Sequence, residues 1–305
     1  GIEEEKRSMQ SSWIKNLVLL ILVVAIAFFV LNNQEADKET TTRFPVSDLK
    51  LSSFEEVKIF FPSRTQTSFK LTNLGWRMVK PFDARADELY VYRILALLAT
   101  TSPVKLEPQE LDKYGLDNPV LRIVFSNASQ KEEFLFGTYN AVTEDQYMLF
   151  QNNIFLVSGG FSETASFVAE ELIDKKSIAT FERIKSYDYS RLEQWQEIRL
   201  KFNHSNGQWT TNSEKISFNQ NEMDEWFDLT WRKPEAIAVE PYKMDARIGY
   251  KSFDMTLEDG KKITFYRIQE HPELKLYRSD EKLLYRYPSD LGFTMLNPNI
   301  AIPEE

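Results

Sequence analysis

The sequence predicts an α+β protein with one N-terminal transmembrane helix and two similar lobes, each an antiparallel sheet packed with a helix. Two observations support this fold class. Leu17 to Leu31 is a run of fifteen apolar residues, the only such run in the 305-residue chain. The rest of the chain repeats one order of strand and helix patterns, with turn-rich segments between them.

The apolar run and its uncharged flanks are long enough to cross a bilayer. At 1.5 Å per residue, the charge-free interval from Asn16 to Gln34 reaches the ~30 Å of the hydrocarbon core. Trp13 stands where an interfacial aromatic is expected. A buried core helix would carry polar residues on one face, and a cleaved signal peptide would end in a small-x-small site, which Asn32 to Ala36 lacks. We therefore expect a retained transmembrane helix over residues 16–34.

Flanking charge predicts the orientation of this helix, because cytoplasmic flanks collect Lys and Arg. Three basic residues precede the helix and two follow it: Lys6, Arg7 and Lys15, then Lys38 and Arg43. Residues 1–8 can be read as an addition before an initiator Met9, and the bias then rests on Lys15 and the terminal amine. A short tail before a large domain and the absence of Cys favour the same orientation. We expect a single-pass protein of the cytoplasmic (inner) membrane, with a cytoplasmic N-terminus and an extracytoplasmic (periplasmic) bulk.

The charge balance excludes one class of partner. The chain has 46 acidic and 37 basic residues and a net charge of -9, and its first 31 residues contribute no net charge. The part beyond the helix is therefore acidic. Nucleic-acid binding requires a basic surface that neutralises phosphates, so we expect no nucleic-acid partner.

Composition and periodicity divide the chain into six segments. We expect a tail, a transmembrane helix, a linker, a first lobe, a second lobe and a C-terminal tail at residues 1–15, 16–34, 35–45, 46–180, 181–298 and 299–305. In the first lobe, alternating apolar residues predict strands around 57–61 and 69–78, followed by an amphipathic helix from Asp87 to Thr100. Hairpins are expected from residue 120 to 157, and a further helix from Phe161 to Ile173.

The second lobe repeats this order. The strand Ile198 to Phe202 leads to Trp209 as the strand Val57 to Phe61 leads to Trp76, and a helix from Glu222 to Trp231 follows, with Asn219 as its N-cap. Ala236–Pro241 then mirrors Pro103–Pro108. In both halves 31 residues separate the Trp from the Glu before that Pro. Coincidence between two α+β segments is the alternative, but the shared order is long for chance.

The chain resembles the DUF4340 family, a domain of unknown function. Five features carry the resemblance: Trp76 followed by Pro81, Ala86-Asp87 at a helix start, the run Tyr114-Gly115-Leu116-Asp117-Asn118-Pro119, Phe136-Gly137, and Leu172 with Asp174-Lys175. Ile173 departs from the family, in which an Arg usually precedes the Asp-Lys pair. The resemblance implies a membrane-anchored extracytoplasmic protein, similar in some members to the auxiliary component of gliding-associated ABC transport systems, with no established reaction and no catalytic residues.

Motifs for metal binding and catalysis are missing from the sequence. There is no Cys and there are only two His, His204 and His271, each expected in a surface turn. No nucleophile elbow and no phosphate-binding Gly motif occurs. The acidic pairs Glu144/Asp145 and Asp224/Glu225 read as solvated surface, and Glu258-Asp259-Gly260 as a hairpin turn. We expect no catalytic, cofactor or metal site.

The remaining residues of interest are aromatic or belong to turns. Trp195, Trp226 and Trp231 are either core residues or an interaction surface, depending on whether they lie on an open face. Trp76, Trp209 and the turn residues Tyr114, Gly115, Leu116 and Pro119 are expected to be structural.

The sequence therefore favours a non-catalytic accessory or scaffold subunit of a membrane complex. Its expected partners are the lipid bilayer and integral membrane subunits, and the resemblance points to an ABC transporter permease. The alternative is a tethered ligand-binding protein with a cleft between its lobes.

Overall fold

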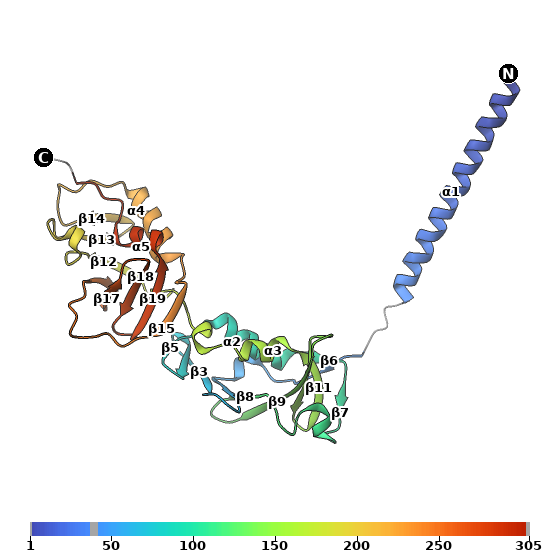
Figure 1. Ribbon diagram of the computed structural model, residues 1–305, viewed down its shortest axis with the longest axis horizontal. Helices are drawn as coiled ribbons and strands as arrows, with labels where there is room; N and C mark the ends of the chain where they lie inside the picture. Colours follow the sequence, from blue (N-terminus) through green and yellow to red (C-terminus); the bar gives the residue numbers. More distant parts are fainter. Residues whose placement is uncertain (1, 37–41, 303–305) are drawn as a thin grey trace.

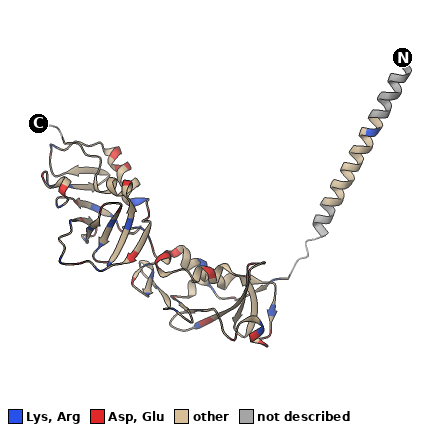
Figure 2. Ribbon diagram, in the orientation of Figure 1, with Lys and Arg blue, Asp and Glu red and all other residues tan. Residues whose placement is uncertain are grey.

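The computed structural model describes residues 2–36 and 42–302, with side chains described for 13–30 and 42–302. Residues 37–41 of the expected linker and 303–305 of the expected tail lie outside the described residues. Helix α1 (Ile2–Ala36) stands apart from two lobes (Figure 1). Its segment Trp13–Val30 is apolar enough to span a membrane, and none of that segment is buried. Lys15 is the only charged residue of segment 13–30 of α1, and Figure 2 shows most of this segment in tan.

The first lobe is built on a nine-stranded antiparallel sheet in the order β5-β4-β3-β2-β8-β9-β10-β11-β7. Its strands are β2 (Glu56–Phe60), β3 (Thr67–Thr72), β4 (Gly75–Lys80), β5 (Ala84–Arg85), β7 (Lys105–Leu106), β8 (Leu121–Ser126), β9 (Lys131–Asn140), β10 (Asp145–Phe150) and β11 (Asn153–Ser158). A separate short pair joins β1 (Phe44–Pro45) to β6 (Thr101–Ser102).

Helices cover one face of this sheet (Figure 1). The helix α2 (Glu88–Leu95) begins at Asp87, whose carboxylate accepts a hydrogen bond from the Leu89 amide, and it continues as the 3-10 helix η2 (Ala96–Ala99). Its buried residues are Val91, Ile94, Leu95, Leu97 and Leu98. The expected helix from Phe161 to Ile173 is divided into α3 (Gly160–Ala165) and η4 (Ala169–Leu172). Two further 3-10 turns are η1 (Leu51–Ser53) and η3 (Leu111–Tyr114).

The second lobe contains an eight-stranded antiparallel sheet in the order β14-β13-β12-β16-β17-β18-β19-β15. Its strands are β12 (Ile184–Asp188), β13 (Lys201–Ser205), β14 (Gln208–Thr211), β15 (Ala238–Pro241), β16 (Ser252–Leu257), β17 (Lys262–Gln269), β18 (Glu273–Arg278) and β19 (Leu283–Pro288). The helices are α4 (Gln220–Phe227), the π-helix η6 (Asp228–Arg232), α5 (Ser289–Leu296) and the 3-10 turn η5 (Glu193–Trp195). Three of the eight residues of α4 are acidic, and Figure 2 shows them on the outside of the lobe.

The two lobes have the same topology. From β4 to β7 and from β14 to β15, the strand orders correspond one to one, and β5 is an addition to the first lobe. In each lobe the main helix lies in sequence between the Trp-bearing strand and the edge strand that follows it, β7 or β15. The prediction of two similar lobes, each an antiparallel sheet packed with a helix, is confirmed.

One detail of the predicted repeat is wrong. The strand expected from Ile198 to Phe202 begins only at Lys201, because residues 198 and 199 form a turn, and this strand, β13, corresponds to β3 and not to β2. The true counterpart of β2 is β12, which periodicity did not reveal. The reason is a bulge: the register of β12 against β16 shifts between Ile184 and Ser186, which breaks the alternation of apolar residues.

An equivalent hydrogen bond ties sheet to helix in both lobes. The Trp76 amide donates to the carboxylate of Glu88 at 2.8 Å, and the Trp209 amide donates to the side-chain oxygen of Gln220 at 2.7 Å. Glu88 and Gln220 are the first residues of α2 and α4. The two tryptophans are therefore equivalent in position and in bonding, as the spacing from Trp to Glu-Pro predicted.

The connector between the lobes, defined here as residues 172–178, is bonded to both. On the first lobe, Ile173 bridges Ala86, and the Asp174 amide donates to the Arg85 carbonyl at 2.8 Å. On the second lobe, the Lys175 carbonyl accepts a hydrogen bond from the Ala236 amide at 2.8 Å. Further bonds reach Ser177 from Tyr287 and Arg278. Both lobes therefore hold the connector along its length.

Candidate functional site at the lobe junction

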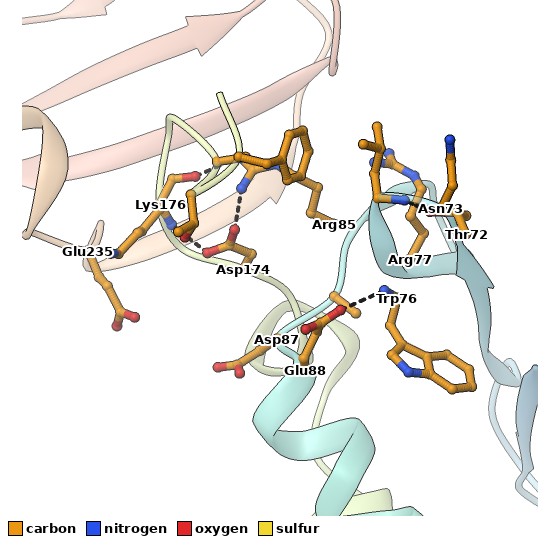
Figure 3. Close-up of a pocket in the computed structure, with 15 residues that line it drawn as sticks. Thr72, Asn73, Trp76, Arg77, Arg85, Asp87, Glu88, Asp174, Lys176 and Glu235 are labelled. Atoms are coloured by element: carbon orange, nitrogen blue, oxygen red, sulfur yellow. Dashed lines mark hydrogen bonds and ion pairs between the residues drawn. The ribbon is translucent and has the colours of Figure 1, made fainter. Parts of the chain in front are cut away.

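A cluster of buried charged groups lies where the connector meets the two lobes, beside a cavity of about 560 Å³. The cavity walls come from three parts of the chain (Figure 3): the β3–β4 hairpin with β5 and the start of α2, the connector with residues 179–181 after it, and the loop before β15. Exposed Leu74 and Phe181 also line this cavity. Its volume is in the range of small-molecule sites.

Arg85 links the first lobe to the second. Arg85 is buried, with an exposed fraction of 7% for the residue. It pairs with Asp174 of the connector and with Glu281 of the second lobe, the latter at 3.0 Å. It also donates to the Lys176 carbonyl at 2.6 Å and to the Tyr285 hydroxyl at 3.1 Å. Burial alone would lower the pKa of Arg85, but Tyr285, Glu281 and Asp174 together raise it, so the guanidinium is held in its charged form.

A second buried arginine, Arg278, continues this network. It makes a two-pronged pair with Glu182, with both N–O distances 2.7 Å, and it pairs with Asp280 at 3.0 Å. Glu281 lies 3.3 Å from Arg278 and 3.0 Å from Arg85, so it joins the two arginines. Burial acts to raise the pKa of Glu182, but hydrogen bonding and the charge of Arg278 outweigh it and the pKa is lowered. We call these residues the junction network: Arg85, Asp174, Glu182, Arg278, Asp280, Glu281 and Tyr285.

Besides the two arginines, Asp174 and Tyr285 of the junction network have raised pKa values. Burial raises the pKa of Asp174 although Arg85 opposes it, and burial, followed by the charge of Glu281, raises the pKa of Tyr285 far above its usual range. Perturbed pKa values are found at catalytic sites and also in structural ion-pair networks. Here the Tyr285 hydroxyl donates to Glu281 at 2.6 Å and Asp174 is paired with Arg85, so both groups are held by protein partners.

Three further charged groups of the cavity are engaged by the protein. Asp87 caps α2, Glu88 accepts from the Trp76 amide, and Arg77 pairs with Asp83 at 3.1 Å. Within residues 13–30 and 42–302, no group of three or more His, Asp or Glu side chains is placed to hold a metal ion. The members of the junction network therefore pair with one another across the boundary between the two lobes.

The three tryptophans considered as an interaction surface do not form one. Trp195, Trp226 and Trp231 are 8%, 4% and 2% exposed and belong to the core of the second lobe. The Trp195 and Trp226 indoles donate to the carbonyls of Leu296 and Thr294 at 2.9 and 2.7 Å. Their burial supports the interpretation of these three tryptophans as core residues.

The turn residues of the family motif act in packing. Gly115 ends η3 with a φ of +68°, and a Cβ there would lie 2.9 Å from the Thr138 amide nitrogen. Gly137 lets the Tyr114 carbonyl approach β9, and a Cβ at Gly137 would collide with it. Leu116 is 3% exposed, and Tyr114 packs edge-on against Tyr147. The chain then passes through Pro119 into β8. The motif therefore packs the loop that precedes β8 against strand β9.

Sequence reasoning missed the junction network. Arg85 and Glu281 are 196 residues apart, and no local pattern distinguishes a buried Arg from an exposed one. The one signal available was the Asp174-Lys175 pair in the family motif. Ile173, where an Arg is usual in the family, is fully buried, and the guanidinium that pairs with Asp174 comes from Arg85.

The fold and the junction define a class: two-lobed α+β proteins with one helix able to span a membrane. The sequence profile described as a domain of unknown function, DUF4340, matches residues 76–255, and the chain belongs to this family. The match reaches from the Trp strand of the first lobe into β16, so the family pattern includes much of the second lobe. No curated protein and no solved structure is significantly similar to the chain.

Proposed function

We propose that this protein is a non-catalytic, single-pass accessory or scaffold subunit of a membrane protein complex. In this proposal α1 crosses the cytoplasmic membrane with the N-terminus in the cytoplasm, and the lobes dock in the periplasm on integral subunits. The partner class that we favour is an ABC-type transporter permease, because of the resemblance of the family to auxiliary components of such systems.

The junction network is the observation that supports this proposal best. Binding proteins that close around a ligand move their lobes about a hinge. Here the connector is hydrogen-bonded to both lobes, and Arg85 spans from β5 to the second lobe. Removing charges from water is costly, and a buried network holds a defined geometry only when every member is paired. A fixed two-lobed body on a membrane anchor suits docking rather than capture.

Gentle extraction of the full chain from native membranes, followed by native mass measurement, tests the proposal. We expect a defined complex that contains integral membrane subunits. A matched variant with leucine at residues 17–31 keeps the anchor but removes its specific side chains. If the lobes carry the docking, this variant retains the partner. A wild-type chain that is extracted alone under these conditions contradicts the proposal.

The cavity of about 560 Å³ supports a second function, a tethered ligand-binding protein. Leu74 and Phe181 at its wall are 62% and 49% exposed and leave apolar surface for a ligand. Native mass measurement of the same sample would then show a discrete additional mass. The variant Leu74→Trp fills this wall without touching the junction network, and it would lose that mass. An unmodified mass for the wild-type chain counts against ligand capture here.

A further inference from the structure

A second cavity, of about 410 Å³, lies in the second lobe beside the connector. We call it the aromatic cavity. It is enclosed by the end of the connector, β12, the β13–β14 hairpin and η6. Fifteen residues line it, and they divide into an aromatic wall and a basic rim. Its volume is sufficient for a small organic molecule.

Buried aromatic side chains form the wall of the aromatic cavity. Tyr187, Trp209 and Trp231 are each at least 97% buried, as their exposed fractions of 2%, 3% and 2% show, and Phe227 is half-buried beside them. The His204 ring stacks on Trp209 with a centroid distance of 4.5 Å and widens this surface. Flat apolar groups gain from such walls through offset and edge-on ring contacts.

One polar atom of this wall is available to a ligand. Within the part of the chain whose side chains are described, the Tyr187 hydroxyl has no hydrogen bond, whereas the buried Trp231 indole nitrogen lies beside the Tyr189 hydroxyl. Other buried tyrosines of this lobe are satisfied: Tyr189 donates to the Met295 carbonyl at 2.8 Å and Tyr287 to Ser177 at 2.7 Å. A ligand acceptor can bond the Tyr187 hydroxyl in place of water.

The rim of the aromatic cavity carries a surplus of positive charge. Four basic residues, Lys176, Arg183, Arg232 and Lys233, face two carboxylates, Glu182 and Glu258. Arg232 is paired with Asp228, and Glu182 is paired with Arg278 in the junction network. Among the described side chains, the other three basic residues have no ion-pair partner. A local surplus of two positive charges remains in a chain of net charge -9.

We propose that the aromatic cavity binds a small organic anion with a flat apolar body, such as an aromatic carboxylate. The body lies against the aromatic wall, where His204 and Phe227 have the larger exposed surfaces. The anionic group lies at the rim near Arg183 and Lys233, where charge-assisted hydrogen bonds are available. This site is separate from the cavity at the lobe junction and does not depend on the proposed accessory function.

The test uses the full chain in a nonionic detergent with 1-naphthoate as the probe. Binding is followed by calorimetry and by quenching of tryptophan fluorescence, since Trp209 and Trp231 belong to the wall. The neutral analogue 1-naphthamide has nearly the same shape and lacks the charge. We expect it to bind about tenfold more weakly, and we expect naphthoate affinity to fall as salt is added.

Paired variants separate this site from general charge attraction. Arg183→Gln with Lys233→Gln removes the rim charges and is expected to weaken naphthoate binding at least ~10-fold. The control, Lys185→Gln with Lys215→Gln, removes two exposed charges of the same lobe that do not line the cavity, and it should bind as the wild type does. All four side chains are exposed, so folding should be kept.

Tyr187→Phe removes only the unpartnered hydroxyl. We expect a loss of about 3-fold to 10-fold in naphthoate affinity without a lower thermal midpoint. Decanoate has the same charge on a flexible chain, and we expect it to bind more weakly than naphthoate. Equal binding by the rim variant and the control, or tighter binding of naphthamide or decanoate than of naphthoate, would overturn the proposal.

Discussion

Replacement of Arg85 by Met should lower the free energy of unfolding and let the two lobes unfold in separate transitions. The substitution retains an extended apolar side chain and removes the guanidinium, which bonds Asp174, Glu281, the Lys176 carbonyl and the Tyr285 hydroxyl. Asp174 and Glu281 are then left largely buried beside a neutral residue, with side-chain exposures of 25% and 10%. Breaking a buried ion pair by removing one partner costs about 3 to 5 kcal/mol.

The structure supplies a matched control in the next strand. Arg77 of β4 lies opposite Arg85 of β5 and pairs with Asp83, whose side chain is 73% exposed. A surface pair of this kind contributes only about 0 to 1 kcal/mol, so Arg77→Met should be nearly neutral. The comparison therefore holds residue type and sheet position almost constant and changes the burial.

Urea unfolding of the full chain in detergent, followed by tryptophan fluorescence and by far-UV circular dichroism, measures both effects. Four tryptophans lie in the second lobe and one in the first, so fluorescence mainly reports the second lobe. In the wild type we expect the two signals to change together. In Arg85→Met we expect a loss of about 3 to 5 kcal/mol and separate transitions. A loss equal to that of Arg77→Met, with coincident transitions, would refute the inference that Arg85 joins the lobes.

Three further outcomes follow from local contacts. Gly115→Ala should lower the free energy of unfolding by about 2 to 4 kcal/mol more than Gly207→Ala, because both glycines have positive φ but only a Cβ at 115 meets nearby atoms; urea titration measures the difference. Gln220→Ala should lower the free energy of unfolding by about 1 to 3 kcal/mol, because its amide bonds both the N–H and the carbonyl of Trp209. Glu182 has a lowered pKa, so wild-type stability should fall as pH drops below about 4.5 through that lowered value. The variant Glu182→Gln should have a lower free energy of unfolding at neutral pH, and that free energy should change less with pH below about 4.5. Parallel curves of unfolding free energy against pH for the variant and the wild type would contradict this.

The sequence by itself determined the elements whose signals are local. The apolar run gives α1 because the hydrophobic length of a bilayer can be read residue by residue. Asn219 caps α4 as predicted, α2 begins just after Asp87, where a helix start was expected, and Gly115 takes the left-handed conformation expected of it. The duplication was also readable, because a constant spacing from Trp to Glu-Pro survives in both halves and reflects equivalent strands, β7 and β15.

Only the tertiary structure decided what depends on residues that are distant in the chain. The bulge in β12 breaks the alternation of apolar and polar residues, so the sequence pattern did not reveal this strand. Its pairing with β16 is seen only in the folded sheet. The tryptophans 195, 226 and 231 could be surface or core until the helices were placed over them. Arg85 and Arg278 look like any other arginines in sequence, because the free energy of a buried charge depends on partners that the chain brings together only after it folds.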